Sequence, residues 1–380
     1  MKPRSFLHFS PQRTVFISVL SIFALVILLL PIPTLGQENI TTLNWEFSSQ
    51  GLPVTGTPPR VINVTSLISA PNRFAPTEIL YAATAGAGVF RSSDTGRTWS
   101  AVNIGLNNLT VNTLFADGAN IYAGTASGLF RTGDAGQRWE AVPIRALSNG
   151  FPFSTSFITC GIIGQVGNRK TIFIGSANGV FRTADDGATW EYFNQGLPST
   201  QFITALQIFN QRLFAGTPND GVLSISLETA NDTWQQPRQG LFPLSVTSFV
   251  TLGQQRIFAG TNGAGVFQST DVGATWTPAN SDLANPNVSA LAVAGTRLYA
   301  STSIGVYASA NAGGFWTNIN TGFPIRAAGS ILPFGNQLFV AAGGNILRGT
   351  VFFARPPVIN LVSPSSTPSR LTGDAVEITL

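Results

Sequence analysis

Tryptophan spacing constrains the fold of this chain more than any other feature of the sequence. The tryptophans recur at intervals of 40 to 54 residues, at Trp45, Trp99, Trp139, Trp190, Trp234, Trp276 and Trp316. Short alternating strands lie between them. A period of about 40 to 50 residues built from such strands is typical of a β-propeller, in which each repeat is a four-stranded blade. The spacing therefore predicts an all-β ring.

A common segment precedes most of these tryptophans. It reads GVFRSSDTGRTW over residues 88–99, with close copies at residues 128–139, 179–190 and 265–276 and decayed copies at residues 221–234 and 305–316. The apolar pair at its start ends one strand and Thr-Trp begins the next, so the residues between form a tight turn. The Asp carboxylate can accept backbone N–H groups of that turn, and Gly supplies a positive φ. The Trp then buries a large surface beside it.

This segment resembles the Asp-box, or BNR, repeat, whose motif is Ser-x-Asp-x-Gly-x-x-Trp. The resemblance implies structural roles for Ser92, Asp94, Gly96, Trp99, Thr132, Asp134, Gly136, Trp139, Thr183, Asp185, Gly187, Trp190, Ser269, Asp271, Gly273 and Trp276. Photosystem II assembly factors and related secreted propellers share such repeats. Similarity to them over residues 42–353 implies a propeller that acts through protein contacts.

The two ends of the repeat array predict seven blades. Residues 329–334, 337–342 and 345–352 form three strands that lack a box and a Trp, while residues 42–47 form an outer strand with no blade before them. Pairing the N-terminal strand with the last three strands completes a seventh blade and removes an open joint from the ring. We expect the propeller to span residues 37–353 and to be a monomer.

The segments outside the propeller have their own patterns. Residues 1–36 combine a basic start with an apolar run from Val15 to Leu30, which is typical of a secretory signal peptide and favours cleavage after Gly36; an uncleaved anchor is the alternative. Residues 354–380 begin with a Pro-Pro linker, and the stretch from Pro357 resembles the start of a TIG immunoglobulin-like module or forms a tail. The chain is therefore expected outside the cytoplasm, secreted or in the cell envelope.

Composition argues against several classes of function. Without Lys2, Arg4 and Arg13 of the leader, the chain has 18 basic and 17 acidic residues, and this balance disfavours nucleic-acid binding. We expect contact with a membrane only through an uncleaved leader. The single His lies in the leader, so His-based catalysis and His-ligated metals are excluded from the mature chain. Cys160 lies in an apolar run and is expected to pack as a small hydrophobe. We expect no metal, no cofactor and no catalytic residues.

Two enzyme classes share Asp-box propellers and remain a less favoured alternative. Sialidases resemble the repeat, but their arginine triad, Tyr nucleophile and Phe/Tyr-Arg-Ile-Pro motif have no counterpart here; Glu191 beside Tyr192 falls on an expected outer strand. Xyloglucanases resemble it too, but they place carboxylates between two propellers, and two carboxylates across a substrate are what glycoside hydrolysis requires. The box aspartates are expected to be occupied by their turns.

Two groups of residues are candidates for partner binding. In a propeller the turns between strands 1–2 and 3–4 share one face, which we call the box face, and the 2–3 turns and 4–1 connections share the other, which we call the far face. Cations gather at the box face, and the candidates there are Arg212, Arg256 and Arg297. Residues 143–157 are an insertion that carries Phe151 and Phe153, expected as an exposed contact or as a loop folded onto its blade. An acidic partner would meet the box face and a neutral ligand the far face.

The favoured function is therefore an exported, non-catalytic binding or scaffold propeller with a protein partner. A carbohydrate-binding surface module is the alternative, and a glycoside hydrolase of the sialidase or xyloglucanase type comes last.

Overall fold

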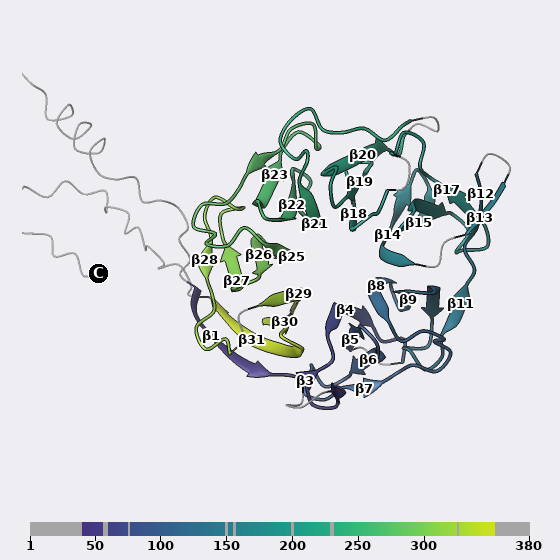
Figure 1. Cartoon of the computed structure of the whole chain (residues 1–380). Helices are drawn as coiled ribbons and strands as arrows, with labels where there is room; N and C mark the ends of the chain where they lie inside the picture. The colour runs from purple at the N-terminus through teal and green to yellow at the C-terminus, as the bar shows by residue number, and fades with distance from the viewer. Residues whose placement is uncertain are drawn as a thin grey trace, which may run out of the picture. The chain divides into compact units, whose positions relative to one another are not determined.

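Antiparallel meanders repeat along the chain and stand side by side around a central opening (Figure 1). This computed structural model describes residues 40–55, 60–74, 77–148, 151–154, 157–198, 201–228, 232–324 and 327–353. Within those ranges the chain contains strands and turns but no helix, and seven of its eight sheets form blades, which confirms the expected seven-bladed β-propeller. The expected signal peptide and TIG-like segment lie outside the described residues. No described helix is long and apolar enough to span a membrane.

We name the blades A to G in the order of their inner strands. Blade A comprises β4 (Val64–Pro71), β5 (Glu78–Thr84), β6 (Gly88–Ser92) and β7 (Ser100–Ala101). Blade B comprises β8 (Val111–Asp117), β9 (Asn120–Thr125), β10 (Gly128–Thr132) and β11 (Glu140–Val142). Blade C comprises β14 (Ile158–Val166), β15 (Arg169–Ser176), β16 (Gly179–Thr183) and β17 (Trp190–Tyr192), extended by β12 (Arg145–Ser148) and β13 (Phe151–Ser154).

The remaining blades are less uniform. Blade D has only β18 (Ala205–Phe209), β19 (Arg212–Gly216) and β20 (Val222–Ser226). Blade E comprises β21 (Ser245–Leu252), β22 (Arg256–Asn262), β23 (Gly265–Ser269) and β24 (Thr277–Pro278). Blade F comprises β25 (Val288–Ala294), β26 (Arg297–Thr302), β27 (Gly305–Ser309) and β28 (Thr317–Asn318). A small hairpin, β2 (Val54–Thr55) with β3 (Arg60–Val61), precedes blade A.

Blade G closes the ring. It comprises β29 (Ala328–Phe334), β30 (Gln337–Ala342) and β31 (Asn345–Phe353), with β1 (Ile40–Phe47) as its outer strand. The pairing of β1 with β31 is antiparallel and places Trp45 opposite Gly349, which confirms the expected closure by the N-terminal strand. Ile40 pairs with Phe353 at the end of this ladder, so the chain enters and leaves the propeller at the same point. That end lies on the box face, because the 2–3 turn at Gly343 and Gly344 marks the far-face end of β31.

The second strand of each blade is packed from both sides. Strand β9, for example, is buried from Ile121 to Thr125 because blades B and C meet over it. A Cβ added to Gly216 would lie 2.8 Å from Cγ1 of Val246 in the next blade, and one added to Gly260 would lie 2.8 Å from Cγ1 of Val288. Real Cβ atoms do not approach so closely. The recurring Gly therefore lets neighbouring blades converge, as the small residues of the sequence indicate.

The hydrophobic core is divided among the joints between blades. Seven clusters of buried residues occur in the described chain, and each draws on two adjacent blades. Four tyrosines at equivalent strand positions belong to these clusters and are all buried, namely Tyr81, Tyr122, Tyr299 and Tyr307. Because no blade has a core of its own, the stability of each blade depends on its neighbours.

Candidate functional site

The box turns hold their aspartates by local hydrogen bonds. In blade A, Oδ1 of Asp94 accepts from the Ser92 hydroxyl (2.7 Å) and from the Thr98 amide (2.9 Å), while Oδ2 accepts from the Thr98 hydroxyl (2.6 Å). The amide of Gly96, at φ 80°, donates to Ser92 Oγ (2.8 Å). The turns of Asp134, Asp185 and Asp271 follow the same plan, and Asn311 takes the Asp position in blade F. These carboxylates are committed to their turns.

The protonation of these aspartates follows from that geometry. Hydrogen bonds from the Thr183 and Thr189 hydroxyls lower the pKa of Asp185 to about 2. Burial alone would raise the pKa of Asp94, but hydrogen bonds from Thr98 and Ser92 outweigh it and bring that pKa to about 2 as well. A general acid in glycoside hydrolysis needs a raised pKa, so neither carboxyl has the protonation that this role requires.

The box tryptophans connect one blade to the blade before it. Trp45 is partly buried and the other six are buried. Most donate an indole N–H across the joint to the backbone carbonyl of the residue three positions after the Trp of the preceding blade. These bonds run from Trp45 to Ile319 (2.9 Å), Trp99 to Ser48 (2.7 Å), Trp139 to Val102 (2.6 Å), Trp234 to Phe193 (2.8 Å) and Trp316 to Ala279 (2.7 Å). We call this bond the Trp latch. Trp190 Nε1 and Trp276 Nε1 are buried without a hydrogen-bond partner.

An asparagine four residues after the Trp is a second repeated element that sequence analysis missed. Asn103 accepts from the Val89 amide (2.7 Å) and donates to the Ala87 carbonyl (2.9 Å), which ties the outer strand to the 2–3 turn. Gly88 leaves room for it, because a Cβ there would lie 2.2 Å from Asn103 Oδ1. The equivalents are Asn194, Asn280 and Asn320. The recurring Trp-x-x-x-Asn spacing was a signal that could have revealed them.

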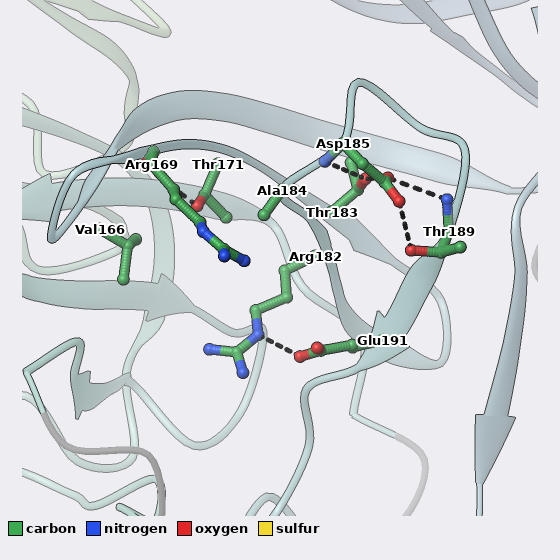
Figure 2. Close-up of a pocket in the computed structure, with 9 residues that line it drawn as sticks. All are labelled: Val166, Arg169, Thr171, Arg182, Thr183, Ala184, Asp185, Thr189 and Glu191. Carbon is green, nitrogen blue, oxygen red and sulfur yellow. Dashed lines mark hydrogen bonds and ion pairs between the residues drawn. The ribbon is translucent and has the colours of Figure 1, made fainter.

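Three contiguous cavities hollow the box face over blades B and C, and we call them together the box-face groove. The cavity that Figure 2 draws has a volume of about 320 Å³ and is lined by Val166, Arg169, Thr171, Arg182, Thr183, Ala184, Asp185, Thr189 and Glu191. Asp185 also lines a second cavity. This second cavity shares two lining residues, Arg131 and Asp186, with a third. The third cavity adds Arg73 and Arg138.

The cations in and beside the groove differ in whether a carboxylate pairs with them. Figure 2 shows Arg169 and Arg182 extending into the same space. Arg182 is held by an ion pair with Glu191 (2.6 Å) and lies over the Phe193 ring, 4.1 Å from its centroid. Lys170 binds Asp117 (3.0 Å) and Asp186 (2.5 Å), and these hydrogen bonds raise its pKa. No ion pair joins the guanidinium groups of Arg73, Arg138 and Arg169 to a carboxylate in the described part of the chain.

The cations proposed from sequence fall outside this groove. Arg212 donates to Ser224 Oγ (3.2 Å) and lines a separate cavity with Arg238, and Arg256 donates to Gln268 Oε1 (3.4 Å). Arg297 is a correction to the expected surface set, because it is only 8% exposed and burial lowers its pKa. It is therefore not available on the box face as Arg212 and Arg256 are.

The insertion forms a hairpin and not an open loop. Strands β12 and β13 pair with each other, and β12 runs parallel to β17 at the outer edge of blade C. The structure thus supports the alternative in which the insertion folds onto a blade. Phe151 and Phe153 lie in β13, and their side chains are outside what the structure describes.

The described residues contain no group of His, Cys, Asp and Glu that could hold a metal ion. Burial raises the pKa of the Cys160 thiol to about 12, so it stays protonated and packs with the apolar residues of the joint between blades C and D. Tyr192 donates to the Asn178 carbonyl (3.3 Å) while Glu191 pairs with Arg182. Each side chain of that Glu-Tyr pair is therefore engaged with a different partner.

Comparisons with known proteins agree with this architecture. A family model described as the DUF6242 beta propeller domain matches residues 199–338. No curated protein sequence matches the chain. Among solved structures, YCF48 bound to a D1 peptide is similar with a TM-score of 0.61 at 17% identity, over 83% of this chain and 98% of that one.

Two further solved structures come from chains that are longer than the part similar to this propeller. The extracellular domain of BT4673 from B. thetaiotaomicron is similar with a TM-score of 0.58 at 17% identity, over 80% of this chain but 40% of that one. The GH74 xyloglucanase from Xanthomonas campestris is similar with a TM-score of 0.58 at 16% identity, over 80% of this chain and 53% of that one. At these identities the likeness concerns the fold alone, and the chain is similar to β-propellers of binding, sensor and hydrolytic proteins.

Proposed function

We propose that this chain is an exported, non-catalytic Asp-box propeller that binds an acidic segment of a protein partner in the box-face groove. The observation that carries the proposal is the set of guanidinium groups in the groove, at Arg73, Arg138 and Arg169, that form no ion pair with a carboxylate of the described chain. Arginine forks match carboxylates bidentately, so an acidic segment supplies what the groove lacks.

The immobilised charges of the groove support selectivity for such a segment. Arg182 is fixed by Glu191 and Phe193, and Lys170 by two aspartates, so these side chains lose little freedom when a partner binds. The same carboxylates reject a partner that is uniformly acidic, because like charges brought together raise the free energy of the complex. We therefore expect a segment in which acidic residues are separated by neutral ones.

The non-catalytic part of the proposal rests on the carboxylates of the groove. Asp185 is held by its turn with a lowered pKa, and Glu191 is ion-paired with Arg182. Export rests on the leader of residues 1–36 and on the likeness to extracellular propeller domains. Partner binding agrees with a similar propeller, YCF48, having been solved with a bound peptide.

The test begins with a photo-crosslinking amino acid at Ala184, an exposed residue of the groove, in cells that express the full chain. The crosslinked peptide is identified by mass spectrometry, synthesised, and titrated against purified protein by calorimetry. Changing Arg73, Arg138 and Arg169 together to Gln should weaken binding at least about tenfold, since each charge-assisted hydrogen bond contributes about 1.5 kcal/mol or more.

The matched control changes Arg212 and Arg256 to Gln, which removes the same charge type from the same face outside the groove. Equal affinity of the groove variant and the control would refute the groove as the contact. Hydrolysis of a fluorogenic sialoside or of xyloglucan by the purified protein would refute the non-catalytic assignment.

A further inference from the structure

Seven structurally equivalent residues stand at the far-face ends of the inner strands, one in each blade. Each directly precedes an apolar residue that stands at or next to the start of an inner strand. We call them the mouth positions: Asn63, Thr110, Phe157, Phe202, Ser245, Asn287 and Ala327. Their equivalence is visible in the hydrogen bonds of the residue that follows. The carbonyls of Val111, Ile158, Ile203, Val246 and Val288 each accept a side-chain hydrogen bond from the preceding blade.

Two neighbouring mouth positions differ from the rest. Five are small or polar, whereas blades C and D place Phe157 and Phe202 there. Each of these side chains is 39% exposed, and their ring centroids lie 6.3 Å apart at an interplanar angle of 48°. Because the other blades close with Asn, Thr, Ser or Ala at the same place, blade packing does not require an aromatic ring. An exposed aromatic pair at such a position points to a ligand.

The rest of the mouth is polar but nearly uncharged. A cavity of about 310 Å³ lies at the joint of blades G and A, lined by Asn63, Ala327 and the Gly343-Gly344 turn among others, with no charged side chain. Figure 1 shows the inner strands of these blades, β29 and β4, across the opening from β14 and β18. Among the 2–3 turns, all of which the structure describes, Asp220 is the one charged residue.

The exposed area decides between a protein and a small ligand. A standard protein interface takes about 800 Å² from each partner. At 39% exposure, two aromatic rings of about 150 to 250 Å² offer on the order of 60 to 100 Å² each. These two rings alone are far too little for a protein contact, but their exposed area matches one or two sugar rings.

We propose that the far-face mouth binds a neutral saccharide that stacks on Phe157 and Phe202. The C–H bonds of a pyranose face are polarised toward positive charge and are attracted by the negative face of an aromatic ring. The amides and hydroxyls of Asn63, Thr110 and Ser245 can bond sugar hydroxyls, and a neutral ligand needs no charged partner there. This site differs from the box-face groove in face and in ligand class, so it does not depend on the proposed function.

The experiment titrates the purified full chain with neutral oligosaccharides: cello-, xylo-, manno- and malto-oligosaccharides and chitin oligomers. Binding is followed by calorimetry and by saturation-transfer NMR. In the test variant Phe157→Thr and Phe202→Ser are combined, which introduces the residues that blades B and E carry at the mouth and so preserves the fold. Phe74→Ser is the control, because Phe74 is 68% exposed on a 1–2 turn of the box face.

We expect at least one saccharide to bind the natural sequence, and the double variant to bind it at least about tenfold more weakly, as the loss of two stacking contacts predicts. The Phe74 variant should bind within about twofold of the natural sequence. Absence of binding to all neutral oligosaccharides at millimolar concentration overturns the proposal, as does equal binding by the double variant. Leu109, Phe242 and Ile304 are also exposed on the far face, so binding of apolar peptides instead of sugars, lost in the double variant, overturns it in favour of a protein contact.

Discussion

The joints between blades are of two kinds, and the difference shows what the tryptophans do. Where the Trp latch forms, the indole N–H of one blade reaches a carbonyl of the blade before it. It is missing for Trp190, which follows the insertion after blade B, and for Trp276, which follows the three-stranded blade D. The box turns of blades C and E are nonetheless intact. A box turn therefore depends on its own residues, whereas a latch also needs a carbonyl of the preceding blade within reach of the indole N–H.

The closing joint is the strongest test of this comparison, because β1 supplies both an outer strand and the Trp45 latch. Deleting residues 37–48 should destabilise the whole ring cooperatively. The loss in free energy of unfolding should exceed the roughly 3–5 kcal/mol of a single buried aromatic truncation. Urea unfolding followed by tryptophan fluorescence measures it. Deleting residues 354–380 is the control and should leave the midpoint unchanged; an equal loss in both would contradict the role of β1.

Trp→Phe substitutions separate the two kinds of joint directly. At Trp139 and Trp316 the change removes a donor and leaves a buried carbonyl without its partner, whereas at Trp190 and Trp276 it removes a donor that has no partner. We expect the first two to cost about 1–3 kcal/mol more than the second two. Chemical denaturation of the four single variants checks this, and equal losses at all four would show that packing alone matters.

The outer strand can be loosened without touching the latch. Replacing Asn194 with Ala removes its bonds to the Val180 amide and the Asn178 carbonyl and should cost about 1 kcal/mol. Asn194→Ser should cost less, because Ser49 bonds both polar groups of Ile346 at the same place in blade G. Thermal unfolding of the two variants tests the order, and a Ser variant no better than Ala would contradict it.

The smallest effect concerns pH. The folded pKa of Asp185 is about 2, below the ordinary value of 3.8, so its ionised form is favoured by folding. The stability that it contributes is present above about pH 4 and is lost as the pH falls through the folded pKa. Natural protein and Asp185→Asn should therefore differ most at neutral pH and converge toward pH 2. Urea titrations at pH 7, 4 and 2.5 measure the gap, and a constant gap would count against this account.

The repeated features of the fold could be predicted because they are local. The Trp spacing and the box residues predict strands and turns within each blade, and the unmatched strands at the two ends predict the closure. The burial of Arg297 could not be predicted this way. It begins a second strand as Arg212 and Arg256 do, but Ala308 stands where those blades carry Ser224 and Gln268 as polar partners.

The candidate sites were less visible in the sequence because they join different blades. Arg73, Arg138 and Arg169 come from three blades, and Phe157 and Phe202 meet although 44 residues separate them. The three arginines have no common spacing, and the two Phe stand at repeat positions that carry small or polar residues in the other blades. The Asn four residues after Trp99, Trp190, Trp276 and Trp316 had such a spacing and could have been found.

The pairing of Ile40 with Phe353 has a mechanical consequence. A force that pulls the chain by its two ends meets the β1–β31 ladder at the terminal pair and opens its hydrogen bonds one after another, not all together in shear. Antiparallel strands loaded in this direction unzip at low force. Tension on both ends would therefore release β1 first and open the ring at blade G, although the same joint holds the propeller closed when no load is applied.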